Sequence, residues 1–454
     1  MRRISINEVF GAINVSLAFI SLGFIQGFGT ISLTSIDLDE EQESWFVSID
    51  ILMSIIFQCI GGKIAEVFGI KKSFLISSPI IVLGWILVGT FVSVSWLLLG
   101  RALSGMGIGV IMVSPSVYIA ETAHPDGRAT LSSFVGLFYS FGVCLLWILG
   151  YFFNWQTLAF LATVPTLLSF VGFLILPDTP YWLVQNQRFE EAYASLKYFR
   201  RNDEDKEVMN EYDEILQHNH QKKELSHSEK LKSMSSLSFV KPFACIGILY
   251  SMYEFSGTAS TTNYLQSIII ESKIELESRT CSLILALVRL FSSLMILVTI
   301  QKMQPKFAYM AFAMIRAVSL LMIGTYFWLQ TNHPEVGIWS GVPFTMITLT
   351  FICHTVLLPF HLILMGEMFP SELRNFSVAI VECVGYSATF VMLKLYTLMK
   401  HSIGLNGIFF FNASFAAFCA IYSSFTIPDN RGKSLSEIEK KINCNTPLIS
   451  NCQK

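Results

Sequence analysis

The sequence predicts an all-α membrane protein whose twelve transmembrane helices form two six-helix halves. The first observation is composition, because 53% of the 454 residues are hydrophobic and only 14% are charged. A soluble protein of this length could not bury so much apolar surface. The second is that apolar stretches of about 20 residues, long enough to cross the roughly 30 Å of bilayer hydrocarbon as helices, recur along the chain. The third is that matching charged residues return in both halves.

The apolar stretches should be helices, because a helix satisfies its own backbone hydrogen bonds in lipid. The twelve expected spans are 13–34, 45–62, 74–94, 97–119, 131–153, 158–176, 239–270, 280–299, 307–330, 342–365, 377–399 and 405–427. The expected domains are an N-terminal six-helix bundle (1–176), a loop with short helices (177–238), a C-terminal six-helix bundle (239–427) and a tail (428–454). The lipid bilayer is therefore the first expected partner.

Basic residues collect on every second connection between spans, which places these connections and both termini on the cytoplasmic side. They include Lys71, Lys72, Arg128, Lys302, Lys306 and Arg374. The net charge of −2 does not indicate a nucleic-acid partner. Because we find neither a cleavable signal nor a retention signal, we expect the plasma membrane as the location.

The loop 177–238 is the long polar interval between the two halves. Within it Phe189, Tyr193, Leu196 and Phe199 recur at helical spacing. This spacing predicts a short amphipathic helix that lies under the bundle.

Metal, cofactor and enzyme chemistry are not indicated by the sequence. His218 and His220 could suggest a metal, but two histidines in a polar run are more typical of a solvated surface. The chain has no nucleotide-binding loop, zinc motif or nucleophile elbow. We therefore expect no metal, no cofactor and no enzyme activity.

Two charged residues are repeated after equivalent spans of the two halves. Span four is followed by Glu121 and, seven residues later, by Arg128. Span ten is followed by Glu367 and, again seven residues later, by Arg374. A Pro-Asp pair also closes both span six and span twelve. A parallel duplication of a six-helix unit explains these coincidences.

Five signatures, spread over nearly the whole chain, carry a family resemblance. They are Gly100-Arg101 with Gly105, Gly107 and Gly109, Tyr118-Ile119-Ala120-Glu121 with Arg128, Pro177-Asp178-Thr179-Pro180-Tyr181-Trp182-Leu183, Gly366-Glu367-Met368-Phe369-Pro370 with Arg374, and Pro428-Asp429-Asn430-Arg431-Gly432. The chain thus resembles the sugar-porter branch of the major facilitator superfamily, and within it the facilitated trehalose transporters. The resemblance implies the major facilitator fold and facilitative transport of a small-molecule solute, trehalose or a hexose, by alternating access around a central cavity.

The resemblance also implies a gate of charged pairs at the cytoplasmic ends of the bundles. The expected pairs are Glu121 with Arg128, Glu367 with Arg374, and Glu66 with Arg101. An exposed ion pair contributes only about 1 kcal/mol, which suits a latch that breaks in every cycle. The alternative is that these charges only anchor helix ends. Tyr181 stands where the family has arginine, which removes one further contact of this gate.

The family's usual sugar ligands are mostly replaced. Sugars are held by amides, which donate and accept hydrogen bonds, and by an indole that packs on the ring. The candidate substrate-binding residues in this chain are Tyr250, Tyr253, Glu254, Thr258, Thr261, Arg289, His361 and Tyr386. Those on span seven recur at helical spacing, which predicts one polar stripe along a single helix. The pair Gly385-Tyr386 takes the place of an Asn-Trp pair in the family.

Charged residues within the spans are the most unusual feature of the predicted centre. An ionisable group at mid-bilayer costs at least about 2.5 kcal/mol, so such a residue is seldom without a role. Glu254 and Arg289 either bind a polar or zwitterionic solute or form a closed structural pair between neighbouring helices. Arg316 on span nine has no partner that the sequence identifies. Gly29 lies where proton-coupled members carry an acid, which favours facilitated movement over coupling.

Two alternatives to facilitated sugar transport stay open at this point. The first is a carrier of a different polar or charged solute on the same scaffold, which Glu254 and Arg289 would favour. The second is a non-transporting nutrient sensor, because the motif expected after span eight has lost its acid, glycine and arginine in residues 301–306. Measured uptake would separate these classes.

Overall fold

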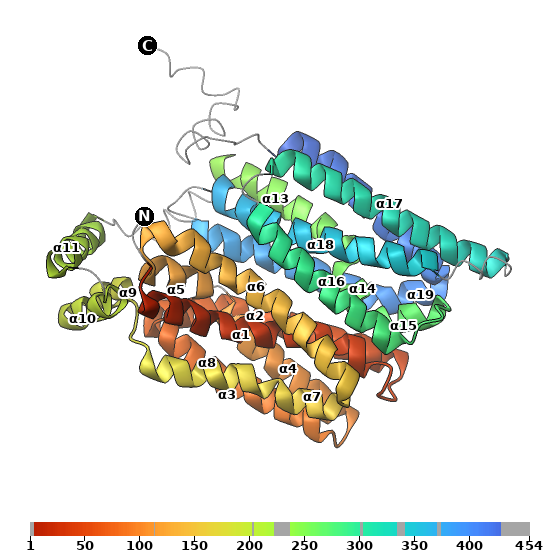
Figure 1. Ribbon diagram of the computed structural model, residues 1–454, viewed down its shortest axis with the longest axis horizontal. Helices are drawn as coiled ribbons and strands as arrows, with labels where there is room; N and C mark the ends of the chain where they lie inside the picture. The colour runs from red at the N-terminus through yellow and green to blue at the C-terminus, as the bar shows by residue number, and fades with distance from the viewer. Residues whose placement is uncertain are drawn as a thin grey trace, which may run out of the picture. The chain divides into compact units, whose positions relative to one another are not determined.

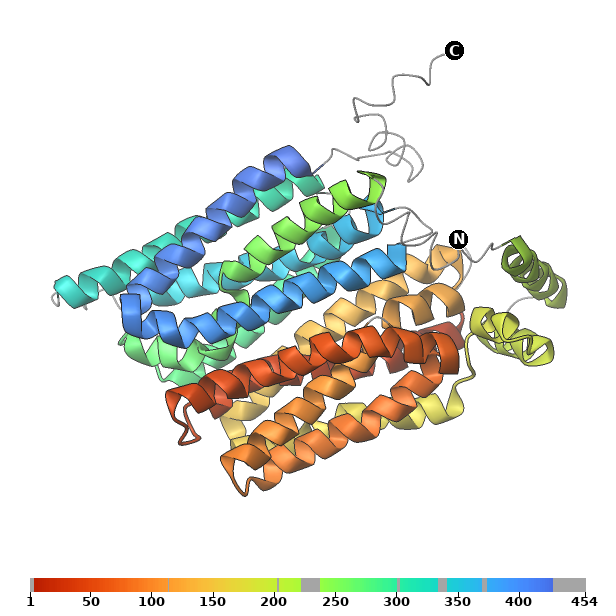
Figure 2. The ribbon, with the colours of Figure 1, turned by 180° about the vertical axis from the view of Figure 1, so that it is seen from behind.

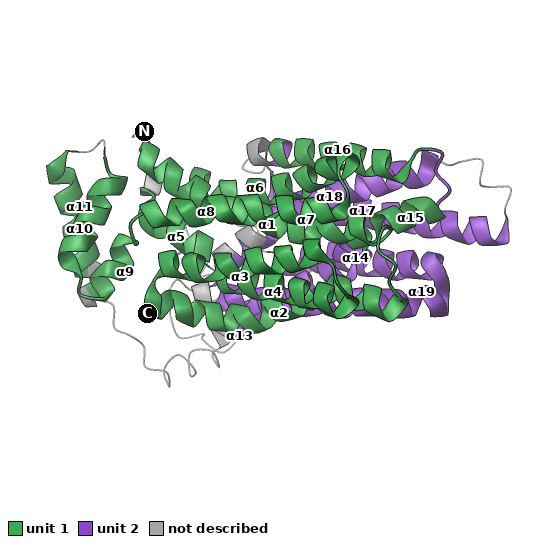
Figure 3. Ribbon diagram, turned by 90° about the horizontal axis from the view of Figure 1, so that it is seen from below, with its two compact units in different colours: residues 1–223, 260–271, 276–294 green, residues 224–259, 272–275, 295–454 purple. Residues whose placement is uncertain are grey.

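The computed structural model describes residues 4–112, 114–201, 204–221, 237–299, 303–333, 341–369 and 374–427. Every regular element in these ranges is a helix (Figure 1). Contacts divide the chain into two compact units, coloured separately in Figure 3. Unit 1 holds residues 1–223, 260–271 and 276–294, and unit 2 holds residues 224–259, 272–275 and 295–454. The grouping follows contacts rather than chain order, because two segments of the predicted second half join unit 1.

Unit 1 contains the first six predicted spans as α1 to α8. The helices are α1 (Ile6–Ser32), α2 (Glu40–Phe68), α3 (Ile70–Thr90), α4 (Val94–Ile111), α5 (Ser114–Thr122), α6 (Pro125–Phe152), α7 (Trp155–Leu161) and α8 (Thr163–Ile175). Three short helices follow, α9 (Pro180–Gln185), α10 (Phe189–Phe199) and α11 (Asp205–Gln221). The unit also includes α15 (Leu265–Glu271) and most of α16 (Ser278–Thr299). Helix α1 packs lengthwise against α6, and α2 against α4.

Four long helices make up most of the described part of unit 2. They are α13 (Leu237–Phe255), α17 (Pro305–Asn332), α18 (Gly341–Met368) and α19 (Arg374–Thr426). Figure 2 shows α19 bent into two arms, and the bend is at Gly404, whose φ of 70° and ψ of 176° are not helical. The two arms correspond to predicted spans eleven and twelve. Helix α19 packs against α17 and α13, and α17 also packs against α18.

The expected count of twelve spans agrees with the structure. Ten helical runs in the described part of the chain are long and apolar enough to cross a membrane. The last run holds two spans because it continues through Gly404. Span seven is not among the ten, and its first part is the 19-residue helix α13. Counting the last run as two spans and adding span seven gives the twelve spans that the hydropathy predicts.

Polar caps define where the first helices begin. The Ser5 hydroxyl accepts a hydrogen bond from the backbone of Asn7, while the Glu8 carboxylate accepts one from the backbone N–H of Ser5 at 2.9 Å. Asp39 and Gln42 form the same capping box at the start of α2. Such caps satisfy backbone donors that have no partner within the helix. They fix the start of both helices.

The glycine run of α4 allows a close approach to α2. A Cβ at Gly105 would overlap the backbone of Asp50, and one at Gly109 would overlap the backbone of Ser54. The Ser54 hydroxyl donates to the carbonyl of Gly105 at 3.0 Å. Glycine is required at these positions because the two backbones leave no space for a side chain.

The predicted continuous helix of span seven is wrong. Helix α13 ends at Phe255, Gly257 has a φ of 81°, and a short helix α14 (Thr258–Asn263) follows. A positive φ is open to glycine without strain and cannot continue a right-handed helix. The expected polar stripe from Tyr250 to Thr261 is therefore divided between helices on either side of the break.

The polar loop forms a small packed layer of helices. The predicted amphipathic helix is confirmed as α10, whose apolar residues meet those of α9 and α11. The buried members of this core are Trp182, Leu183, Val184, Ala192, Leu196, Val208, Tyr212 and Ile215. His218 and His220 fall in the last turns of α11, and their side chains lie outside the description.

Candidate functional site

Three of the predicted substrate-binding residues belong to an aromatic and histidine cluster in unit 2. We define this cluster as Tyr250, Tyr253, Tyr309, His354 and His361. The Tyr253 hydroxyl lies 2.6 Å from Nδ1 of His354, and the Tyr309 hydroxyl lies 3.0 Å from Nε2 of His361. The ring centroids of Tyr253 and His361 are 4.5 Å apart. The cluster joins α13 to α17 and α18.

The hydrogen bonds of His361 indicate which of its nitrogens carries the proton. Its Nδ1 lies 3.1 Å from the carbonyl oxygen of Leu357, which can only accept. Nδ1 therefore donates, and in a neutral ring Nε2 accepts from the Tyr309 hydroxyl. His361 is fully buried, so in this conformation both of its nitrogens are used within the protein.

Tyr386 belongs to the same unit, and its neighbour explains one departure from the family pattern. A Cβ at Gly385 would overlap the ring of Tyr250, which packs directly on the Gly385 backbone. An asparagine at this position would displace that ring. Gly385 thus leaves room for the ring of Tyr250.

Glu254 lies in the last turn of α13, directly before the helix break. Its carboxylate accepts a hydrogen bond from the Thr258 hydroxyl at 2.6 Å and is also within hydrogen-bonding reach of Thr389. Only 8% of the residue is exposed. The cation whose charge acts on it is Arg316 of α17. Unit 2 therefore contains both the acid that we singled out and the arginine that the sequence could not place.

Arg289 and Thr261 belong to unit 1. Arg289 is 1% exposed on α16, and its guanidinium lies 5.8 Å from the ring centroid of Tyr139 on α6. Because Glu254 belongs to unit 2, the expected pairing of Glu254 with Arg289 stays a prediction.

A polar contact that the sequence did not predict joins the C-terminal end of α1 to α14 and α15 within unit 1. The Thr30 hydroxyl donates to the Thr262 carbonyl at 2.5 Å, and the Thr34 hydroxyl donates to Oε1 of Gln266 at 2.9 Å. A Cβ at Gly29 would overlap the side chain of Asn263. Gly29 is thus needed for the close approach of α1 to α14. This explains the glycine without reference to the acid that proton-coupled members carry at this position.

We expect Gly29→Ala to weaken this contact. The added methyl group has no space beside Asn263, so the Asn263 side chain or α1 must shift, and overpacking of this kind costs about 1–3 kcal/mol. The purified protein should melt several degrees lower and transport more slowly. Gly62→Ala is the matched control, since nothing lies within 4 Å of a Cβ there. Equal melting temperatures and transport rates for the two variants would contradict this role of Gly29. Adding Asn263→Ala to Gly29→Ala should restore the melting temperature and the transport rate.

The predicted gate residues of the first half lie near α9. Oε2 of Glu121 accepts a hydrogen bond from the Thr179 hydroxyl at 2.5 Å, and the Glu66 carbonyl accepts one from the Trp182 indole at 3.0 Å. Burial raises the pKa of Tyr181, and the charges of Arg128 and Glu121 both act on it. The side chains of Glu367 and Arg374 lie outside the description, so the gate of the second half stays a prediction.

The expected pairing of Arg101 with Glu66 is corrected by the structure. Arg101 is fully buried and forms an ion pair with Asp50 of α2 at 3.1 Å. It also donates to the carbonyls of Phe46 and Ile25 at 3.2 Å each. Glu66 lies sixteen residues beyond Asp50 on α2, which is about 24 Å along a helix. Arg101 is therefore an internal brace of unit 1.

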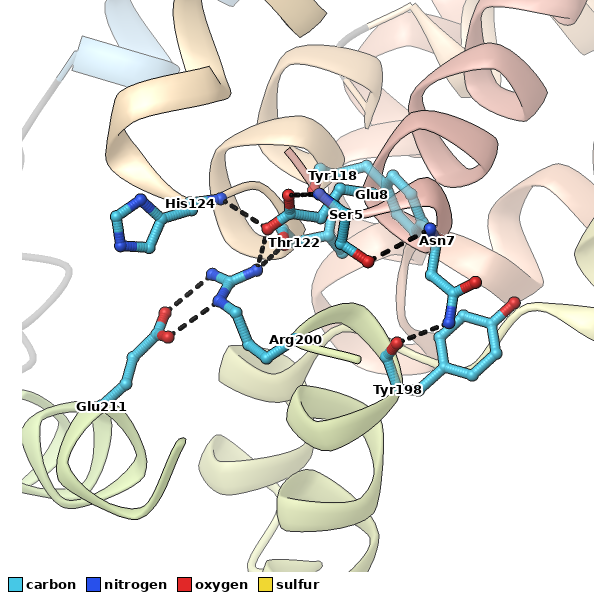
Figure 4. Close-up of polar contacts among 9 residues, drawn as sticks. All are labelled: Ser5, Asn7, Glu8, Tyr118, Thr122, His124, Tyr198, Arg200 and Glu211. Carbon is cyan, nitrogen blue, oxygen red and sulfur yellow. Dashed lines mark hydrogen bonds and ion pairs between the residues drawn. The ribbon is translucent and has the colours of Figure 1, made fainter. Parts of the chain in front are cut away.

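A second charged cluster in unit 1 was missed by the sequence analysis (Figure 4). Arg200, at the end of α10, pairs with Glu8 of α1, and both residues are 2% exposed. Its guanidinium also binds Glu211 of α11 through two bonds of 2.8 and 2.7 Å and donates to the Thr122 carbonyl at 2.8 Å. Glu8 further accepts from the backbone of His124 at 3.1 Å. We call Arg200, Glu8 and Glu211 the Arg200 clamp.

Asp178, in the connection between α8 and α9, is the acid of the repeated Pro-Asp pair. Burial raises its pKa, while the nearby Lys71, Lys72 and Arg188 act in the opposite direction. Lys71 also donates to the Leu176 carbonyl at 2.6 Å. Lys71, in the first turn of α3, thus holds the end of α8.

Comparison with known proteins gives a family for almost the whole chain. A family model described as "Sugar (and other) transporter" matches residues 7–442. The chain is 26% identical over 450 residues to the facilitated trehalose transporter Tret1 of Culex quinquefasciatus, covering 96% of this chain and 86% of that protein. It is 24% identical over 455 residues to Tret1 of Bombyx mori, with coverage of 98% and 89%. It spans only 56% of the Tret1 of Anopheles gambiae.

Solved structures confirm the predicted fold. The inward-open xylose transporter XylE from E. coli superimposes with a TM-score of 0.75 at 18% identity, covering 95% of this chain and 98% of that one. Its partially occluded inward-open form superimposes with a TM-score of 0.76, covering 95% of this chain and 100% of that one. At this identity the likeness establishes the fold alone. The fold is that of the major facilitator superfamily, as the sequence predicted.

Proposed function

The chain belongs to the sugar transporter family, and from that premise we propose that trehalose is the first candidate for its cargo. Facilitative sugar transport is the activity that this membership supports, and it requires neither a cofactor nor enzyme chemistry. The observation that carries the choice of trehalose is similarity over 96% of the chain to facilitated trehalose transporters. Hexoses are the next candidates, because the departures at Glu254 and Gly385 change the residues that would contact a sugar.

The proposed mechanism is alternating access, in which helix ends at each side of the membrane part in turn. The polar contact of Thr30 and Thr34 with α14 and α15 is a candidate closure at one end of unit 1. The contacts of Glu121 and Glu66 with α9 are candidates at the other end. Each depends on a few hydrogen bonds worth about 1 kcal/mol apiece, which a transport cycle can break and remake.

The proposed location is the plasma membrane, with both termini in the cytoplasm. The support is the alternation of basic residues along the connections between spans. On this orientation α9 to α11 lie at the cytoplasmic ends of the helices of unit 1. Antibody access to tags at either terminus, only after cells are permeabilised, is the matching observation.

Uptake into liposomes tests the proposed cargo. Purified protein should give saturable uptake of labelled trehalose or a hexose that stops at equilibrium, without a pH gradient. Amino acids and organic ions should not enter. Protein-free liposomes control for leakage. Accumulation driven only by an imposed proton gradient would contradict facilitated transport.

A second candidate is a carrier of a charged or zwitterionic solute. The buried charge of Arg289 favours it, because ionisable groups within spans commonly mark a solute pathway. Uptake of an amino acid or organic ion in place of every sugar would establish this candidate. Binding of a sugar without any uptake would instead indicate a sensor.

A further inference from the structure

Arg316 occupies an unusual place for a charged residue. It lies within α17 and is 1% exposed. Its Nη2 donates to the Ser256 carbonyl at 3.1 Å, and its guanidinium lies 5.4 Å from the ring centroid of Tyr253. Ser256 directly follows α13, where carbonyl groups lose their partners in the helix and carry a partial negative charge. One edge of the guanidinium thus holds the broken end of α13.

The other donors of the guanidinium make no hydrogen bond within the part of unit 2 that the structure describes. Nε and Nη1 of Arg316 are buried and have no hydrogen-bond partner there. An arginine cannot discharge by losing its proton, so these donors keep a strong requirement for an acceptor. A membrane protein seldom leaves such donors unsatisfied. A solute that supplies acceptor oxygens would satisfy them.

Glu254 supplies the complementary group. Its carboxylate accepts from Thr258 at 2.6 Å and lies within electrostatic reach of Arg316. An ionised carboxylate has about four lone-pair sites, so it can accept further hydrogen bonds. Donors of Arg316 and acceptors of Glu254, with opposite charges, thus both lie at the broken end of α13.

This combination suits one class of solute. A hydroxyl group both donates and accepts, so neighbouring hydroxyls can accept from Arg316 and donate to Glu254. An amide offers the same two functions in one side chain. Because the local charges cancel, a neutral solute meets no unbalanced charge, whereas an ionised solute would add one.

We propose that Arg316 is a solute-binding residue, which donates from Nε and Nη1 to hydroxyl oxygens of a neutral polyhydroxylated solute while Glu254 accepts from the same solute. The inference deepens the proposed function and rests on it, since it names residues that hold the sugar. Arg316 has a second role in positioning, through its bond to Ser256.

Four variants separate solute binding from structure. They are Arg316→Lys, Arg316→Gln, Glu254→Gln and the double variant Glu254→Gln with Arg316→Gln. Arg316→Lys keeps a cation that can still bind the Ser256 carbonyl but loses the planar fork. We expect its KM for the transported sugar to rise about tenfold, the usual cost of one lost hydrogen bond to a charged donor, with little change in melting temperature. Arg279→Gln, at an exposed arginine of α16, is the control.

The double variant distinguishes charge balance from solute contact. It restores neutrality, so a purely structural pair would return to the wild-type KM, whereas a solute-binding pair would stay impaired. A wild-type KM in the double variant, or in Arg316→Lys, would overturn the inference. If the arginine variants do not fold, competition on the wild-type protein replaces them. Neutral sugars should then displace the labelled sugar at least ten times better than the matching uronic acid or amino sugar, and equal displacement would overturn the inference.

The failure of this inference differs from failure of the proposed function. If the wild-type protein takes up no sugar, the proposed function fails before any variant is compared. If it takes up sugar and the Arg316 variants keep its KM, only the inference fails.

Discussion

Replacing Asp50 by alanine should prevent most of the protein from folding. The substitution leaves Arg101 fully buried in unit 1 without the carboxylate that lies 3.1 Å away. Removing one member of a buried ion pair costs about 3–5 kcal/mol, because the remaining charge has no compensation. The carbonyls of Phe46 and Ile25 still accept from Arg101, but they carry no full charge. Detergent-solubilised protein should be mostly aggregated on size-exclusion chromatography.

Two further variants identify the ion pair as the cause. Glu41→Ala removes an exposed acid from the same helix and should behave like the wild type. Asp50→Leu combined with Arg101→Met removes both charges and should recover much of the yield, because apolar residues of similar volume often replace a buried pair without loss. A normal yield and melting temperature for Asp50→Ala alone would show that Arg101 is compensated elsewhere.

The transmembrane pattern could be predicted closely because it depends on the average polarity of long segments. Span one was expected at 13–34, and α1 runs from Ile6 to Ser32. The connection expected between 399 and 405 contains the bend at Gly404. Lipid selects for apolar length, so local details affect these predictions little. The amphipathic helix α10 could be predicted equally well, since four apolar residues repeat at helical spacing.

The break after α13 could not be predicted from periodicity. The positive φ of Gly257 decides it, but Gly257 is one of 28 glycines, and a glycine inside an apolar span more often allows close packing, as Gly105 does. What distinguishes Gly257 is a tertiary contact. A Cβ there would overlap the side chain of Asn412.

Charged residues were found easily, but their partners were not. The sequence suggested Glu66 for Arg101 on the basis of family signatures, while the observed partner is Asp50. Pairing depends on where neighbouring helices place each residue along their axes, which composition does not reveal. The same limit explains why Arg316 had no assigned partner and why Glu8 was not considered at all.

The Arg200 clamp provides the second large effect, because it connects α10 and α11 to the body of unit 1 through one side chain. Arg200→Ala would leave Glu8 buried without its cation, and Glu211 would lose both of its bonds to the guanidinium. We expect a loss of about 3–5 kcal/mol of local stability. The helices α9 to α11 should then be cleaved by protease much faster than in the wild type, while the spans remain folded.

Arg201→Ala is the matched control, since Arg201 is the adjacent residue and is exposed. Arg200→Lys should be intermediate, because lysine keeps the charge near Glu8 but cannot bind Glu211 through a planar fork. Hydrogen exchange in residues 180–221, measured beside exchange in α1, locates the effect. If hydrogen exchange in residues 180–221 is as slow in Arg200→Ala as in Arg201→Ala, the Arg200 clamp does not hold these helices. Faster exchange in α10 and α11 that extends to the start of α1 would instead show that Glu8 transmits the loss of Arg200 into the first span.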